Sequence, residues 1–79
     1  MVTAFVLVKV KPGSDEKLWE DISTLGKVKE IAWVYGEYDL ILKVESFSLD
    51  QLDDFIFALR KIENIKDTKT LIMSKIKSL

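Results

Sequence analysis

The residues best suited to chemistry lie in the segment Tyr35-Gly36-Glu37-Tyr38-Asp39, between two apolar runs. Asp39 stands at the start of an otherwise apolar run, beside a turn that exposes backbone N–H groups. Its carboxylate could accept hydrogen bonds from an α-ammonium group, while N–H groups near Gly36 donate to an α-carboxylate. The segment therefore suits a zwitterion such as a free amino acid. A plain hairpin with aromatic flanks would explain the same residues.

Two threonines could extend this candidate site. Thr68 and Thr70 alternate within an apolar run, so both hydroxyls lie on one face of a predicted strand. A hydroxyl can donate and accept, and either threonine could complete an amino-acid site. Threonine is also common in strands for its β-propensity alone. The candidate ligand-binding residues are Tyr35, Gly36, Tyr38, Asp39, Thr68 and Thr70.

Other chemistry has little basis in the composition. The 79 residues include no Cys and no His, which removes disulfides and the usual thiolate and imidazole ligands of zinc. The acidic cluster Asp50, Asp53 and Asp54 falls in the first turns of a predicted helix, where the helix dipole alone favours carboxylates. We therefore predict no catalytic residue, no metal site and no cofactor, and expect that the protein is not an enzyme.

The charges are balanced and interspersed. Lys and Arg total 12 against 13 Asp and Glu, and the sequence has no basic tract. This argues against direct nucleic-acid binding, which needs clustered positive charge. No apolar run approaches the length of a transmembrane helix, and no signal peptide is evident at the N-terminus. We expect a cytoplasmic protein that does not associate with membranes.

Six elements are predicted to position the candidate residues. Alternating apolar residues indicate strands, and apolar residues three and four apart indicate helices. The predicted order is a strand over 2–11, a helix from Ser14 to Leu25, strands over 27–35 and 38–45, a helix from Ser48 to about Ile62, and a strand over 68–76. This β-α-β-β-α-β order predicts one α+β domain over residues 1–79, with a ferredoxin-like, four-stranded antiparallel sheet.

Turn and cap residues support these boundaries. Gly36-Glu37 between the middle strands fits a two-residue type II′ hairpin loop. Ser48 and Gln51 have the spacing of a capping box at the start of the second helix. Asn64 suits the left-handed conformation that often ends a helix.

The predicted strands are apolar on both faces. In the first strand Val6 and Val8 lie on one face, and Phe5 and Leu7 lie on the other. Both helices of this fold cover the same face of the sheet, so one apolar face is left uncovered. A domain of this size without disulfides or metals also needs a further source of stability. We predict a homodimer packed sheet to sheet, like a dimeric α/β barrel.

Tyr-Gly-Glu-Tyr-Asp-Leu between two apolar strands, followed by a capped helix and Thr-Lys-Thr-Leu-Ile, resembles the RAM domain. That domain is the ligand-sensing half of Lrp/AsnC transcription regulators. The family's Gly-x-Tyr-Asp turn is matched by Gly36, Tyr38 and Asp39, and its Thr-x-Thr pattern by Thr68 and Thr70. The opening VTAFVLVKVKPG is similar to the family's first strand and turn, so the resemblance covers essentially the whole chain.

The resemblance implies an amino-acid-binding sensor linked to transcriptional regulation. Family members form sheet-to-sheet dimers that assemble into octamer- or decamer-like rings, with free amino acids bound near the turn and the threonines. Met1 begins directly on the first strand, so we expect a stand-alone domain without the family's helix-turn-helix half. Such a domain would not bind DNA itself but could associate with full-length regulators. Asn64-Ile65 replaces the Gly-Val that the family commonly has before the last strand.

Other classes share this strand order. A small-molecule enzyme of the dimeric α+β barrel group, such as a monooxygenase-like protein, would want a polar pocket with His, Asn or Arg, and the chain has no His and a single Arg. An ACT-type amino-acid-binding domain would place its ligand near the first strand–helix turn, with which Pro12-Gly13 is compatible. An RNA-binding sheet needs exposed aromatics among basic residues, and the charge balance speaks against it.

Overall fold

The computed structural model describes residues 1–13 and 16–79 and contains the predicted order of elements. The elements are β1 (Val2–Val10), α1 (Glu16–Ser23), β2 (Val28–Trp33), β3 (Leu40–Ser46), α2 (Leu49–Arg60) and β4 (Ile65–Ile72). The predicted β-α-β-β-α-β order is confirmed. The first helix was expected to begin at Ser14, and that residue lies outside the described part of the chain.

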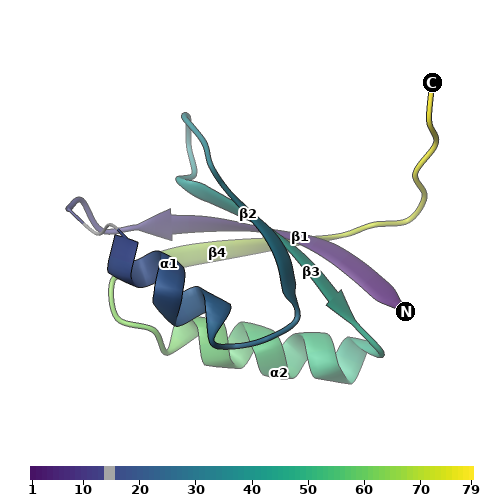
Figure 1. The fold of residues 1–79 in the computed structure, drawn as a ribbon, viewed down its shortest axis with the longest axis horizontal. Coiled ribbons are helices and arrows are strands. Elements are labelled where there is room, and N and C mark those ends of the chain that lie inside the picture. Colours follow the sequence, from purple (N-terminus) through teal and green to yellow (C-terminus); the bar gives the residue numbers. More distant parts are fainter. Residues whose placement is uncertain (14–15) are drawn as a thin grey trace.

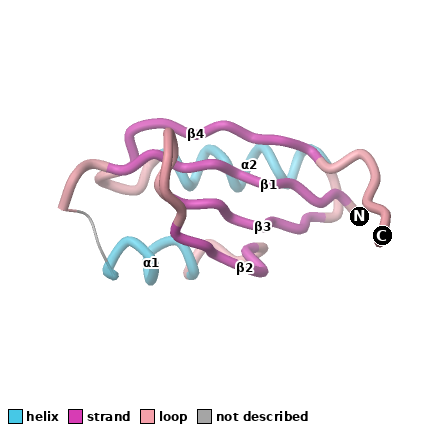
Figure 2. Tube along the Cα trace, turned by 90° about the horizontal axis from the view of Figure 1, so that it is seen from above, coloured by secondary structure: helices cyan, strands magenta, loops and turns pink. Residues whose placement is uncertain are grey.

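The four strands form one antiparallel sheet in the order β2-β3-β1-β4 (Figures 1 and 2). In the centre, Val6 of β1 is paired with Leu42 of β3 on one side and with Thr70 of β4 on the other. The strands β2 and β4 are therefore the two edges of the sheet, and among the described residues no strand pairs with the outer row of backbone groups of β4.

Both helices lie on the same side of the sheet (Figure 1). Helix α2 contacts β3 and β4, and α1 contacts β2. The core lies between the helices and the sheet, and its members are buried apolar side chains from β1, β3 and the two helices. They are Ala4, Val6, Val8, Leu18, Ile22, Leu40, Leu42, Val44, Leu52, Phe55 and Leu59. The even-numbered residues of β1 and β3 thus face the helices.

The opposite face of the sheet, here called the open face, is apolar at its centre. Leu7 is paired with Ile41, and Phe5 is paired with Leu71 across the sheet. Neither helix covers these side chains, and Leu71 is 47% exposed. Strand β1 therefore has apolar side chains on both faces, as predicted, although on the open face Lys43 is also paired with Phe5 and Lys69 with Leu7.

The predicted start of the second helix is confirmed. Ser48 has the extended conformation of an N-cap, and its hydroxyl oxygen accepts a hydrogen bond from the N–H of Gln51 at 3.2 Å. The Gln51 side-chain oxygen accepts in return from the N–H of Phe47 at 3.1 Å. Asn64, with φ of 79°, has the predicted left-handed conformation, although the helix already ends at Arg60.

The connection between β2 and β3 is longer than predicted. A two-residue loop at Gly36-Glu37 was expected, but β2 ends at Trp33 and β3 begins at Leu40. The Val34 N–H donates to the Asp39 carbonyl at 2.9 Å, which leaves four residues in the turn. At the end of the loop the Asp39 side chain is bonded to β1, where it accepts from the N–H of Val10 at 2.9 Å. Residues 34–39 are called the hairpin loop below.

The last strand occupies residues 65–72, whereas residues 68–76 were predicted. It begins early because the left-handed Asn64 completes the turn after α2 at once. Its last pair in the ladder is Ile72 with Ala4, and beyond it the N–H of Met73 donates to the carbonyl of Thr3 at 2.8 Å. The following residues leave the body of the molecule (Figure 1).

Candidate functional site

The hairpin loop carries four of the six predicted site residues. It rises from the sheet on the side opposite to the helices (Figure 1). Tyr35 is fully exposed, whereas Tyr38 and Asp39 are half-buried. Gly36 has φ of 122°, a conformation that a side chain disfavours. The loop therefore presents one aromatic ring that has no packing role in the single chain.

Asp39 has a structural contact that sequence reasoning did not anticipate. Its Oδ2 accepts a hydrogen bond from the backbone N–H of Val10 at 2.9 Å. The β1–β4 pairing shifts register between Lys9 and Val10, and Asp39 satisfies an amide at this irregularity. A carboxylate can accept about four hydrogen bonds, so the interaction leaves acceptor capacity for a ligand.

The two predicted site threonines lie on the helix side of β4. Thr68 is paired with Val8 and Thr70 with Val6, and both valines are buried beneath the helices. The Thr68 hydroxyl oxygen accepts a hydrogen bond from Nε of Arg60 at 3.1 Å. The threonines thus share a face, as predicted.

The structure does not bring the hairpin loop and the threonines together within one chain. Leu40, which follows the loop, and Thr68 are paired with Val8 from opposite sides. They are two strand spacings apart, about 10 Å. The loop also rises from the face opposite to the one that carries the threonines. The six predicted residues therefore form two separate groups, one on each face.

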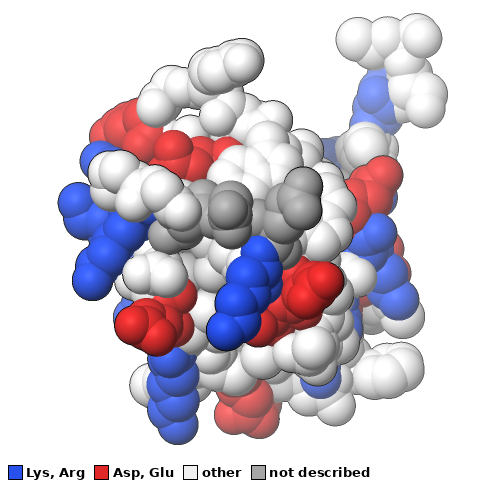
Figure 3. Space-filling model, turned by 60° about the vertical axis from the view of Figure 1, so that its left-hand side comes forward, with Lys and Arg blue, Asp and Glu red and all other residues white. Residues whose placement is uncertain are grey.

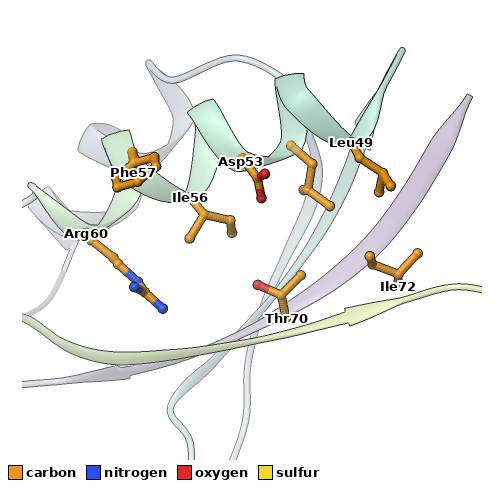
Figure 4. Close-up of a pocket in the computed structure, with 8 residues that line it drawn as sticks. Leu49, Asp53, Ile56, Phe57, Arg60, Thr70 and Ile72 are labelled. Atoms are coloured by element: carbon orange, nitrogen blue, oxygen red, sulfur yellow. The ribbon is translucent and has the colours of Figure 1, made fainter.

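A groove between α2 and β4 has a volume of about 470 Å³ (Figure 4). Helix α2 and strand β4 line it with apolar side chains, one hydroxyl and two opposite charges. The lining residues are Leu49, Leu52, Asp53, Ile56, Phe57, Arg60, Thr70 and Ile72. This α2–β4 groove includes Thr70 and lies beside Thr68. The two predicted site threonines are therefore in or next to the groove.

Asp53 and Arg60 are groove residues that sequence reasoning missed as site candidates. They are seven residues apart, which places both on one side of α2. Figure 4 shows the Arg60 side chain reaching toward β4 and Asp53 facing the groove. Among the described residues, the one ion pair joins Lys43 and Glu30 at 3.9 Å. Neither Asp53 nor Arg60 therefore forms an ion pair within the described part of the chain. The i, i+7 spacing was the signal available in the sequence.

The remaining surface agrees with the balanced composition. On the face drawn in Figure 3, acidic and basic side chains alternate rather than gather in one basic area. Within residues 1–13 and 16–79, no three acidic side chains converge as they would to hold a metal ion. Neither described helix is long and apolar enough to cross a membrane.

The element order and the single four-stranded sheet with both helices on one side define a small α+β module of the ferredoxin-like kind. The chain belongs to the Lrp/AsnC ligand binding domain family, whose model matches residues 3–78. This confirms the resemblance found in the sequence. The family consists of ligand-binding domains of transcription regulators rather than enzymes.

The similar proteins include transcription regulators and small proteins of this fold. The HTH-type transcriptional regulator FL11 of Pyrococcus furiosus is 36% identical over 78 residues, covering 95% of this chain and 50% of the regulator. The chain thus spans about half the length of the curated relatives it matches. The hypothetical protein PHS023 of Pyrococcus horikoshii is 43% identical with a TM-score of 0.85, covering 96% of this chain and 93% of PHS023.

A more distant structure shares the fold alone. The feast or famine regulatory protein Rv3291c of M. tuberculosis, solved in complex with L-methionine, has a TM-score of 0.82 and 22% identity. The likeness covers 99% of this chain and 54% of that protein.

Proposed function

We propose that this regulatory module senses a free amino acid, which binds where the hairpin loop of one subunit meets the α2–β4 groove of another. The observation that carries the proposal is the separation of the two residue groups within one chain. A site that uses both groups needs two copies of the chain. Ligand binding and subunit assembly would then be coupled, because the ligand would bind the subunits only in their assembled state.

The hairpin loop has the groups for the head of an amino acid. Asp39 has acceptor capacity for the α-ammonium group, and backbone N–H groups near Gly36 can donate to the α-carboxylate. Tyr35 is fully exposed and can cover the bound ligand once a second subunit is in place. These residues supply the recognition that any free amino acid requires.

The α2–β4 groove has the properties of a side-chain pocket. Its volume of about 470 Å³ lies within the ordinary range of small-ligand sites, about 300–1,000 Å³. Leu52, Ile56 and Ile72 make it apolar, and the Thr70 hydroxyl adds a directional hydrogen-bonding group. The complex of Rv3291c with L-methionine supports the amino-acid class of ligand.

Assembly would begin at the open face of the sheet. Phe5, Leu7 and Ile41 would be removed from water when two sheets pack against each other. We propose a homodimer of this kind, which assembles further into an octamer or decamer that creates the amino-acid sites. Mixed assembly with full-length Lrp/AsnC regulators would connect the module to DNA without requiring DNA contacts of its own.

The test is isothermal titration of the purified protein with each common amino acid, followed by variants in both residue groups. Tyr35→Ala and Thr70→Val should each weaken binding of the best ligand roughly tenfold, about the contribution of one hydrogen bond or contact. Thr24→Val, which removes an exposed hydroxyl after α1, is the matched control. Wild-type affinity in both site variants would rule out the two-part site.

A further inference from the structure

The segment Met73–Leu79, here called the arm, packs little against the rest of its own chain. After the hydrogen bond from Met73 to Thr3, its residues are exposed and have no regular structure. Ile76 is 79% exposed and Leu79 is fully exposed. The match to the family model nevertheless continues through residue 78. Most of the arm therefore belongs to the domain, although Ile76 and Leu79 pack on little of the single chain.

The direction of the arm points to a second copy of the chain. In Figure 1 the arm leaves the end of β4 and rises on the side opposite to the helices. This is the open-face side, where the proposed assembly would place another subunit. The whole arm of seven extended residues reaches about 23 Å, and Ile76, four residues after the end of β4, reaches about 13 Å, whereas two packed sheets are about 10 Å apart. Ile76 can thus pass the edge of the partner's sheet and reach the near border of its helix side.

The α2–β4 groove is complementary to the arm in shape and charge. The half of the groove near the start of α2 is apolar, with Leu49 at 55% and Ile72 at 54% exposure. Asp53 lines this half, and Asp50 and Asp54 are exposed on the same helix. In the arm, Lys75 and Lys77 flank Ile76. An apolar side chain between two cations matches an apolar groove bordered by carboxylates.

We propose that the arm of one copy docks in the α2–β4 groove of a second copy, with Ile76 against Leu49 and Ile72, and the flanking lysines beside Asp53 and its acidic neighbours. The arm also covers the β4 edge, whose backbone groups would otherwise invite uncontrolled pairing. This contact goes beyond sheet-to-sheet pairing and depends on it only for the direction of the arm. Because Thr70 lines the same groove, the arm would form part of the wall of the ligand site.

The absence of native cysteine allows a direct cross-linking test. Ile76→Cys is made in one preparation and Leu49→Cys in another that carries a purification tag, and the two are mixed and mildly oxidised. Both positions are more than half exposed, so neither change disturbs the core. We expect a disulfide-linked heterodimer of intermediate size. Trp19→Cys on α1, at 39% exposure, replaces Leu49→Cys as the control and should give several-fold less product.

Charge reversal provides a second test. Lys75→Glu with Lys77→Glu should reduce the cross-link, and Asp53→Lys with Asp54→Lys in the receiving copy should restore it. Equal cross-linking at Leu49 and Trp19, or insensitivity to both charge reversals, would overturn the proposal. Leu7→Lys, which tests sheet pairing, alters neither the arm nor the groove, so failure of the assembly is distinguishable from failure of arm docking.

Discussion

The carboxylate of Asp39 accepts a hydrogen bond from the backbone N–H of Val10 at 2.9 Å and so joins the base of the hairpin loop to the central strand. The loop is closed at the same place by the Val34 N–H, which donates to the Asp39 carbonyl. One residue therefore fixes the position of the loop from both its side chain and its backbone. In the proposed site, Asp39 both holds the loop and faces the ligand.

Replacing Asp39 should destabilise the protein as well as weaken ligand binding. Asp39→Ala leaves the half-buried Val10 amide without its acceptor, and we expect a loss of about 1–3 kcal/mol in the free energy of unfolding. Asp39→Asn retains an acceptor oxygen and should cost less. Urea denaturation measures both, with Glu37→Gln in the exposed part of the loop as control. An unchanged unfolding midpoint for Asp39→Ala would show that the hydrogen bond is unimportant.

Gly36→Ala should show whether amino-acid affinity depends on the geometry of the hairpin loop or only on the stability of the protein. At φ of 122° an added side chain strains the backbone by about 1–3 kcal/mol, although no atom lies within 4 Å of the new Cβ. Gly13, with φ of 87° and an equally open Cβ position, is a matched control in another turn. Both variants should lose stability in denaturant titrations, but only Gly36→Ala should lose amino-acid affinity in calorimetry. Equal loss of affinity in both would point to stability as the cause.

Leu7→Lys should prevent sheet-to-sheet pairing. Leu7 lies at the centre of the open face beside Ile41 and Lys69, so the new charge would be buried in the interface next to an existing one. Analytical ultracentrifugation should give a monomer mass for this variant and a larger mass for Glu63→Lys, a change at an exposed position after α2. A mass equal to that of the unaltered protein would contradict pairing through this face.

Removing the cap of α2 should have a moderate and purely structural effect. Ser48→Ala deletes the acceptor of the Gln51 N–H and should cost about 1 kcal/mol of stability. Thermal unfolding followed by circular dichroism would detect this loss, and Ser48→Asp should restore most of it because aspartate also caps helices. A transition temperature unaffected by Ser48→Ala would mean that the hydrogen bond contributes nothing net.

Local signals in the sequence predicted the order of elements and several of their ends. The capping box joins Ser48 and Gln51, which are three positions apart. The turn at Asn64 follows from the tendency of asparagine to adopt the left-handed conformation. Such features are visible in a short window of sequence. The apolar character of both sheet faces was also predictable, because Val6 and Leu7 necessarily point to opposite sides of a strand.

The errors arose where distant segments meet. The hairpin loop is longer than predicted, and its last residue, Asp39, bonds to Val10, which is 29 positions away. The last strand ends at Ile72, which is paired with Ala4 of β1, near the opposite end of the chain. The pairing of Arg60 with Thr68, which places a charge beside the threonines, depends on how α2 packs on β4. Short-range patterns contain none of this information.

The most direct test of the central claim is the solution mass of the purified protein, measured by light scattering without amino acids and with each in turn. If the chain is an assembling amino-acid sensor, it forms a dimer or larger oligomer, and one amino acid changes the mass or its concentration dependence. Gly36→Ala should assemble but lose that response. A monomer at all concentrations, or an oligomer that no amino acid affects in mass or stability, would contradict the account.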